Sequence, residues 1–133
     1  MNKSQVIETF NKHFIEFITD IEKVFPNDND ILTMRKSFNK SLMFSPKTFI
    51  RLFNEYFVKF YSNEIEAGDL SFFMDKDYTR DLQDVPNNPN AERIVSAIDR
   101  LRTPIKSMTA DNQAKIMKYI QNLTKISTMY NMV

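Results

Sequence analysis

The chain of 133 residues contains a single glycine, no cysteine and no tryptophan. Glycine adopts positive φ angles at little steric cost, so phosphate-binding loops, nucleophile elbows and turn-rich β folds depend on it. One glycine leaves almost no room for such structures. The lack of cysteine removes disulfides, thiolate chemistry and most structural zinc sites, which fits a reducing interior.

Phenylalanine is abundant instead, with twelve copies in a chain whose hydrophobic fraction is 42%. Intrinsic disorder requires low hydrophobicity and high net charge, whereas the formal net charge here is +1. A chain of this length is usually one domain. We therefore predict a single all-α domain over residues 1–133, a compact Phe-rich helical bundle of about five to seven helices.

Long hydrophobic runs are also missing. The longest apolar runs span three to four residues, whereas a membrane-spanning helix needs about 20. Glu8 and Lys12 interrupt the N-terminal region, which therefore does not resemble a signal peptide. We expect an intracellular protein with no membrane partner.

Apolar residues recur at steps of three and four in most of the chain, which is typical of amphipathic helices. The predicted helices cover residues 4–24, 29–43, 46–62, 90–102 and 110–131. Their expected N-terminal caps are Ser4, the 27–30 segment, Ser45 followed by Pro46, Asn90 and Thr109. Thr103–Pro104 is expected to break the fourth helix or to start a short turn.

The segment 61–90 is acidic and joins the first three predicted helices to the C-terminal ones. It holds seven acids against Lys76 and Arg80, and its net charge of −5 leaves +6 on the remainder. Gly68 is expected to close a short helical turn, and Asp69 to begin another short helix. Three apolar residues in a row, 72–74, cannot all face one core from a helix.

This acidic segment is the first candidate docking surface, because aromatic residues and methionine are enriched where proteins bind one another. The alternative is a short buried segment that closes one end of the bundle. The candidate residues for protein docking are Asp69, Phe72, Phe73, Asp77 and Tyr78.

Basic residues gather on the second and third predicted helices. Such a patch releases counterions when it binds phosphates, so it is a candidate nucleic-acid surface. The sequence pI of about 7.9 is below that of a dedicated nucleic-acid-binding protein. Solvated helix faces, or contacts with the acidic segment, are the alternatives. The patch consists of Arg35, Lys36, Lys40, Lys47 and Arg51.

Catalytic, metal and cofactor residues are not predicted. His13 is the only histidine and lies beside the apolar stripe of the first predicted helix, where a structural role is expected. Oxygen side chains alternate from Asp75 to Asp81, as in a calcium loop. However, Arg80 stands where that loop needs glycine, and Pro86 stands where it needs a bidentate acid.

The stretch from Glu64 to Tyr78 resembles an acidic D-x-x-FF-x-x-x-D-Y segment of small uncharacterised α-helical proteins of nucleocytoplasmic large DNA viruses. In those proteins, a Phe-rich helical pair precedes the segment and a final helix with a Y-x-x-x-L step follows. The step here runs from Tyr119 to Leu123. The chain lacks the tryptophan often found before that helix; Ile105 or Met108 stands in the region. The resemblance implies a viral origin and an all-helical domain, but no activity.

We therefore expect a non-enzymatic protein–protein interaction or structural module, such as a component of the virion or the virus factory, in the host cytoplasm or the virion. A protein partner is expected and self-association is open. The alternative function is a nucleic-acid-binding accessory protein that uses the basic surface of the second and third predicted helices. Its binding would weaken steeply with salt.

Overall fold

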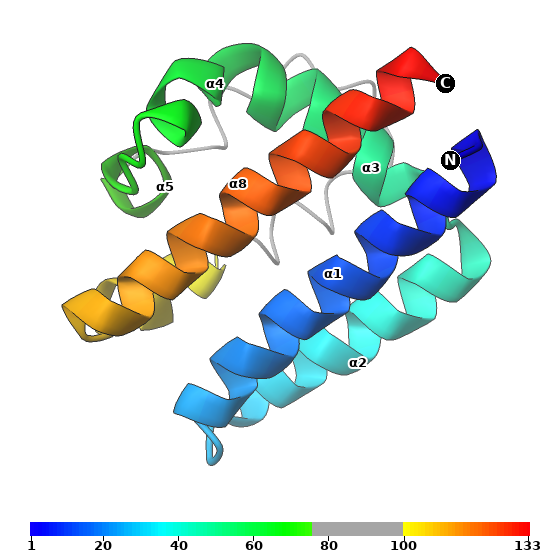
Figure 1. Ribbon diagram of the computed structural model, residues 1–133. Helices are drawn as coiled ribbons and strands as arrows, with labels where there is room; N and C mark the ends of the chain where they lie inside the picture. Colours follow the sequence, from blue (N-terminus) through cyan, green and yellow to red (C-terminus); the bar gives the residue numbers. More distant parts are fainter. Residues whose placement is uncertain (76–99) are drawn as a thin grey trace.

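Two long helices from opposite ends of the chain lie side by side: α1 (Lys3–Val24) and α8 (Ala110–Met132) (Figure 1). The computed structural model describes residues 1–75 and 100–133. Helix α2 (Asn29–Phe44) packs against α1, and Figure 1 shows it on the side away from α8. Helix α1 therefore lies between α2 and α8.

The helical run that follows α2 packs against α8. Helix α3 (Thr48–Leu52), the π-helical segment η1 (Phe53–Val58) and α4 (Lys59–Glu66) follow one another as one helical run, and α5 (Ser71–Asp75) comes after a turn. Residues 100–106 are also helical. The described ranges contain no strand, so the predicted all-α, Phe-rich bundle is confirmed.

Phenylalanine rings form the centre of the core. The ring of Phe14 lies 5.0 Å from that of Phe49, 5.1 Å from Phe38, 6.1 Å from Phe17 and 6.5 Å from Phe10. These rings come from α1, α2 and α3, so one aromatic cluster joins three helices. Most of the contacts are tilted or edge-to-face, which the ring quadrupole favours over a face-to-face sandwich.

Two predicted helix starts differ from the structure. Asn2, not Ser4, caps α1: its side chain accepts from the Gln5 N–H, while the Gln5 side chain accepts from the Asn2 N–H. The third helix begins at Thr48 rather than at Pro46. The Thr48 N–H donates to the Ser45 carbonyl and the Asn11 side chain donates to the Pro46 carbonyl, which holds 45–48 as a turn.

The expected break at Thr103–Pro104 is also wrong, because residues 100–106 are helical. Proline's fixed φ is compatible with a helix, although proline removes one N–H donor and crowds the carbonyl four residues before it. The Ser107 N–H then donates to the carbonyls of Thr103 and Pro104 at 3.2 Å, where the helix ends.

Two predicted boundaries are confirmed. Gly68 has φ +73° and closes α4: its N–H donates to the Ile65 carbonyl, and that of Asp69 to the Glu64 carbonyl. Only glycine takes this left-handed conformation cheaply, so this is a Schellman motif. Thr109 caps α8 by accepting from the Asn112 N–H. The elements expected between residues 76 and 99 lie outside the described residues.

Candidate docking surface

Helix α2 has an apolar inner face and a basic outer face. Ile31, Met34 and Phe38 are buried in the core. Lys36 and Lys40 are exposed, and one helical turn separates them, so they share the opposite face. The last turn of α2 adds two large apolar side chains to this outer side. Neither Met43 nor Phe44 lies on the buried face that contains Phe38.

These two side chains are almost fully exposed. Met43 is 84% exposed and Phe44 is 81% exposed, although seven other phenylalanines are buried in the core. Single exposed apolar residues are normal, but two large adjacent ones form a patch. Burying such a side chain in a contact contributes about 1.5–3 kcal/mol. We call Lys40, Met43, Phe44 and Lys47 the α2–α3 corner.

The rest of the fold holds the corner in place. The Asn11 side chain of α1 donates to the Pro46 carbonyl at 2.9 Å, and the hydroxyls of Ser45 and Thr48 hydrogen-bond to each other. Phe49 is buried directly after the turn. The chain on both sides of the corner is thus anchored to the rest of the fold.

The predicted basic patch is only partly available for binding. The Arg35 guanidinium forms an ion pair with the Glu22 carboxylate of α1, and both side chains are about three-quarters buried, at 27% and 24% exposed. Arg35 therefore helps to fix α2 against α1. The other predicted patch residues are exposed and form no ion pair with described residues: Lys36, Lys40, Lys47 and Arg51.

The acidic segment contributes little exposed aromatic surface where it is described. Phe73 is only 4% exposed and belongs to the core, which favours the alternative in which the segment closes one end of the bundle. Asp69 is exposed, and hydrogen bonds from the side chain and backbone of Ser71 lower its pKa. The Phe72 side chain, Asp77 and Tyr78 lie outside the described residues.

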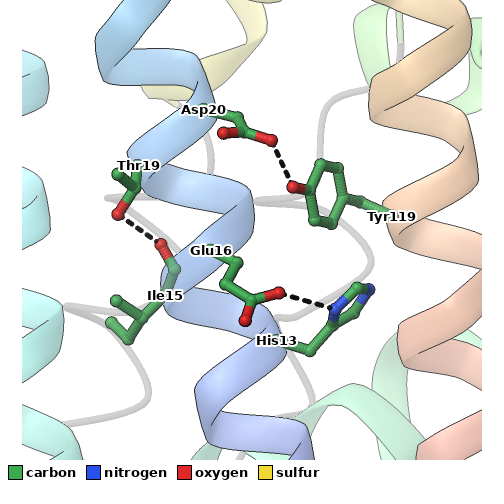
Figure 2. Close-up of polar contacts among 6 residues, drawn as sticks. All are labelled: His13, Ile15, Glu16, Thr19, Asp20 and Tyr119. Atoms are coloured by element: carbon green, nitrogen blue, oxygen red, sulfur yellow. Dashed lines mark hydrogen bonds and ion pairs between the residues drawn. The ribbon is translucent and has the colours of Figure 1, made fainter.

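A polar cluster lies between α1 and α8 (Figure 2). The Tyr119 hydroxyl donates to the Asp20 carboxylate, and His13 Nδ1 lies 3.5 Å from the Glu16 carboxylate. The His13 and Tyr119 rings are 4.9 Å apart. Burial, and then the bond to Asp20, raise the pKa of Tyr119 to about 12. The phenol therefore stays protonated and donates, which gives this cluster a structural role in joining the two helices.

Tyr119→Phe is expected to lower the free energy of unfolding by about 1 kcal/mol near neutral pH, because the hydroxyl hydrogen bond is lost. The folded pKa of Tyr119, about 12, is above the unfolded value near 10. The stabilisation is therefore present below pH 10 and declines as the pH rises from about 10 to 12. Urea unfolding across this pH range measures the difference between the two proteins.

Tyr130→Phe is the matched control for this substitution. Tyr130 is on the same helix, its ring lies 4.8 Å from the Lys3 ammonium, and its hydroxyl has no hydrogen bond to a described residue. Its loss is expected to change stability by less than about 0.5 kcal/mol. Equal effects of the two substitutions would contradict the role given to the Tyr119–Asp20 bond.

Metal binding and membrane spanning were considered for the part of the chain that is described. Among the described residues, no group of three or more histidine, aspartate or glutamate side chains is arranged to hold a metal ion. Asp28 has a structural role, because its carboxylate accepts from the N–H groups of Asp30 and Ile31 and caps α2. None of the described helices is long and apolar enough to cross a bilayer.

Comparison of the chain with protein-family models, with curated proteins and with solved structures finds no match. Sequence reasoning did not select Met43 and Phe44, although one signal was present. On a helix whose stripe is Ile31, Phe38 and Leu42, the next two residues turn about 100° and 200° away from that stripe.

Proposed function

We propose that this chain is a non-enzymatic module that binds other proteins through the α2–α3 corner. The observation that carries the proposal is the exposure of Met43 and Phe44, at 84% and 81%, at a corner anchored to the core. Large apolar side chains that protrude from a rigid element are typical anchors of protein interfaces. Because the corner is already ordered, little conformational entropy is lost when it binds.

The charges around the corner indicate an acidic partner surface. Lys40 and Lys47 flank the apolar pair, and no acid occurs between Ile31 and Asn54. Opposite charges at the rim of an interface accelerate association and disfavour wrong partners. The partner surface thus combines an apolar hollow with acidic side chains. The viral resemblance extends the proposal to a structural component of a virion or virus factory.

The test is capture of partners by the tagged full-length chain from the cells in which it is naturally made, with and without nuclease. Three baits are compared: the wild type, Lys40→Glu/Lys47→Glu, and Lys115→Glu/Lys118→Glu. The last is the matched control, because it makes the same charge change on the exposed side of α8. We expect the wild type and the control to retain a protein in stoichiometric amount after nuclease treatment.

The corner variant should recover at least about tenfold less of that protein, which is about 1.4 kcal/mol of binding free energy. Equal recovery by all three baits would contradict the assignment of the corner. Loss of every protein after nuclease, with DNA or RNA recovered before it, would favour the nucleic-acid alternative. In that case the loss on charge reversal would come from phosphate contacts.

A further inference from the structure

Helix α2 carries a second surface feature at its other end. An open depression with a volume of about 630 Å³ lies where α1 ends and α2 begins. We call it the α1–α2 hollow, and its lining residues are Val24, Phe25, Pro26, Asn27, Asp28, Asn29 and Asp30. Its apolar part includes Val24, which is 39% exposed. Because the depression is open rather than enclosed, it suits the side chains of a partner better than a small molecule.

The hollow and the corner are complementary in charge. Asp28 and Asp30 give the hollow negative charge, and Asp30 is exposed. Asp28 caps α2 through Oδ1 only, which leaves its second carboxylate oxygen free to accept from another donor. The corner offers Met43 and Phe44 between two exposed lysines. The basic, apolar corner thus matches the acidic, partly apolar hollow.

We infer that a second copy of this chain is a partner of the corner: Met43 and Phe44 of one copy enter the α1–α2 hollow of the next. Lys40 and Lys47 then face Asp28 and Asp30 of that copy. The inference rests on the proposed function, because it names an occupant for the same corner. The hollow is then the binding site for the apolar and basic side chains of the corner of another copy.

The two features lie at opposite ends of one helix, which decides the kind of assembly. Asp30 and Met43 stand near the two ends of α2, and the 13 residue steps between them span about 20 Å at 1.5 Å per residue. A contact between different surfaces leaves a free corner on one copy and a free hollow on the other, so copies add in an open-ended row. Pairing corner to corner would instead place lysines against lysines, which disfavours a two-fold dimer through this surface.

The contact is small, which sets the expected strength. Two side chains in an open depression bury less than the roughly 1,200 Å² of a stable interface, and such contacts are weak and transient. We expect a dissociation constant on the order of 10–100 μM at low salt. The lysine–aspartate pairs lie at the rim, so the association weakens as ionic strength rises.

Sedimentation velocity of the purified full-length chain tests the inference over a concentration range of about 5–500 μM. Two charge variants are compared with the wild type: Lys40→Glu/Lys47→Glu at the corner and Asn29→Lys/Asp30→Lys at the hollow. Lys115→Glu/Lys118→Glu is the control for a charge change elsewhere. Val24→Ser, which removes apolar lining without changing α2, is the second hollow variant if the first does not fold. Circular dichroism checks each fold.

We expect the sedimentation coefficient of the wild type and the control to rise with concentration, and that of each charge variant to stay at the monomer value. A mixture of the two charge variants should associate again, because the intact corner of the hollow variant can enter the intact hollow of the corner variant. Val24→Ser should weaken association at least about threefold.

A wild type that stays monomeric over the whole range would overturn the inference, and so would a mixture of variants that does not associate. Neither result affects the proposed function, which is tested by capture from cells. If the wild type is monomeric but the corner variant still loses a captured protein, the corner binds a different partner. If the corner variants change neither association nor capture, the proposed function also fails.

Discussion

Phe14→Ala is expected to lower the free energy of unfolding by about 3–5 kcal/mol, the usual range for a buried phenylalanine. The Phe14 ring is 5% exposed and lies within 6.5 Å of four other aromatic rings on three helices. Removing it leaves a cavity where α1, α2 and α3 meet. Because small domains are stable by only about 5–15 kcal/mol, this one change removes a large part of the total.

Phe44→Ala is the matched control, because it is the same substitution at a position that is 81% exposed. It is expected to change stability by less than about 0.5 kcal/mol. Urea unfolding followed by circular dichroism measures both variants. If Phe44→Ala cost as much as Phe14→Ala, Phe44 would be buried in the folded chain, and the corner would not be a free surface.

The second large effect is expected on binding rather than on stability. Met43→Ser/Phe44→Ser removes both apolar side chains of the corner and leaves its lysines. Each side chain contributes about 1.5–3 kcal/mol when it is buried in a contact. We therefore expect at least about tenfold weaker binding, with unfolding free energy unchanged within about 0.5 kcal/mol. The readouts are the amount of captured partner and the self-association of the purified chain.

Met129→Ser/Met132→Ser is the control for the corner substitution. These two methionines are 38% and 78% exposed on α8, so the variant makes a similar apolar-to-polar change outside the corner. It is expected to keep both binding and stability. If the corner variant also bound normally in both assays, the apolar pair would have no part in recognition, and the lysines alone would have to explain any effect of charge reversal.

The helices were largely predictable because burial repeats with the helical period. The inward residues Ile116, Ile120 and Leu123 of α8 are buried as the spacing indicates. Local chemistry identified the Thr109 cap and the left-handed Gly68. The start at Asn2 was missed because both Asn2 and Ser4 are good capping residues, and the choice depends on the reciprocal bond with Gln5.

The candidate site depended on packing between distant segments, which spacing alone does not describe. Arg35 belongs to the basic patch by position, but it pairs with Glu22 on another helix. Phe73 stands among acids, yet it enters the core. The turn that follows Phe44 depends on the hydrogen bond from Asn11 to the Pro46 carbonyl, a contact that no local pattern predicts.

Site-specific photo-cross-linking at position 44 tests the central proposal, protein binding through the corner, most directly. The full-length chain carries a photoreactive phenylalanine analogue at position 44, and a second version carries it at the exposed Lys115 of α8 as a control. Irradiation in the cells that make the protein should join position 44, but not position 115, to a protein. Cross-linking at both positions alike, or at neither, would contradict the assignment of the α2–α3 corner as the docking surface.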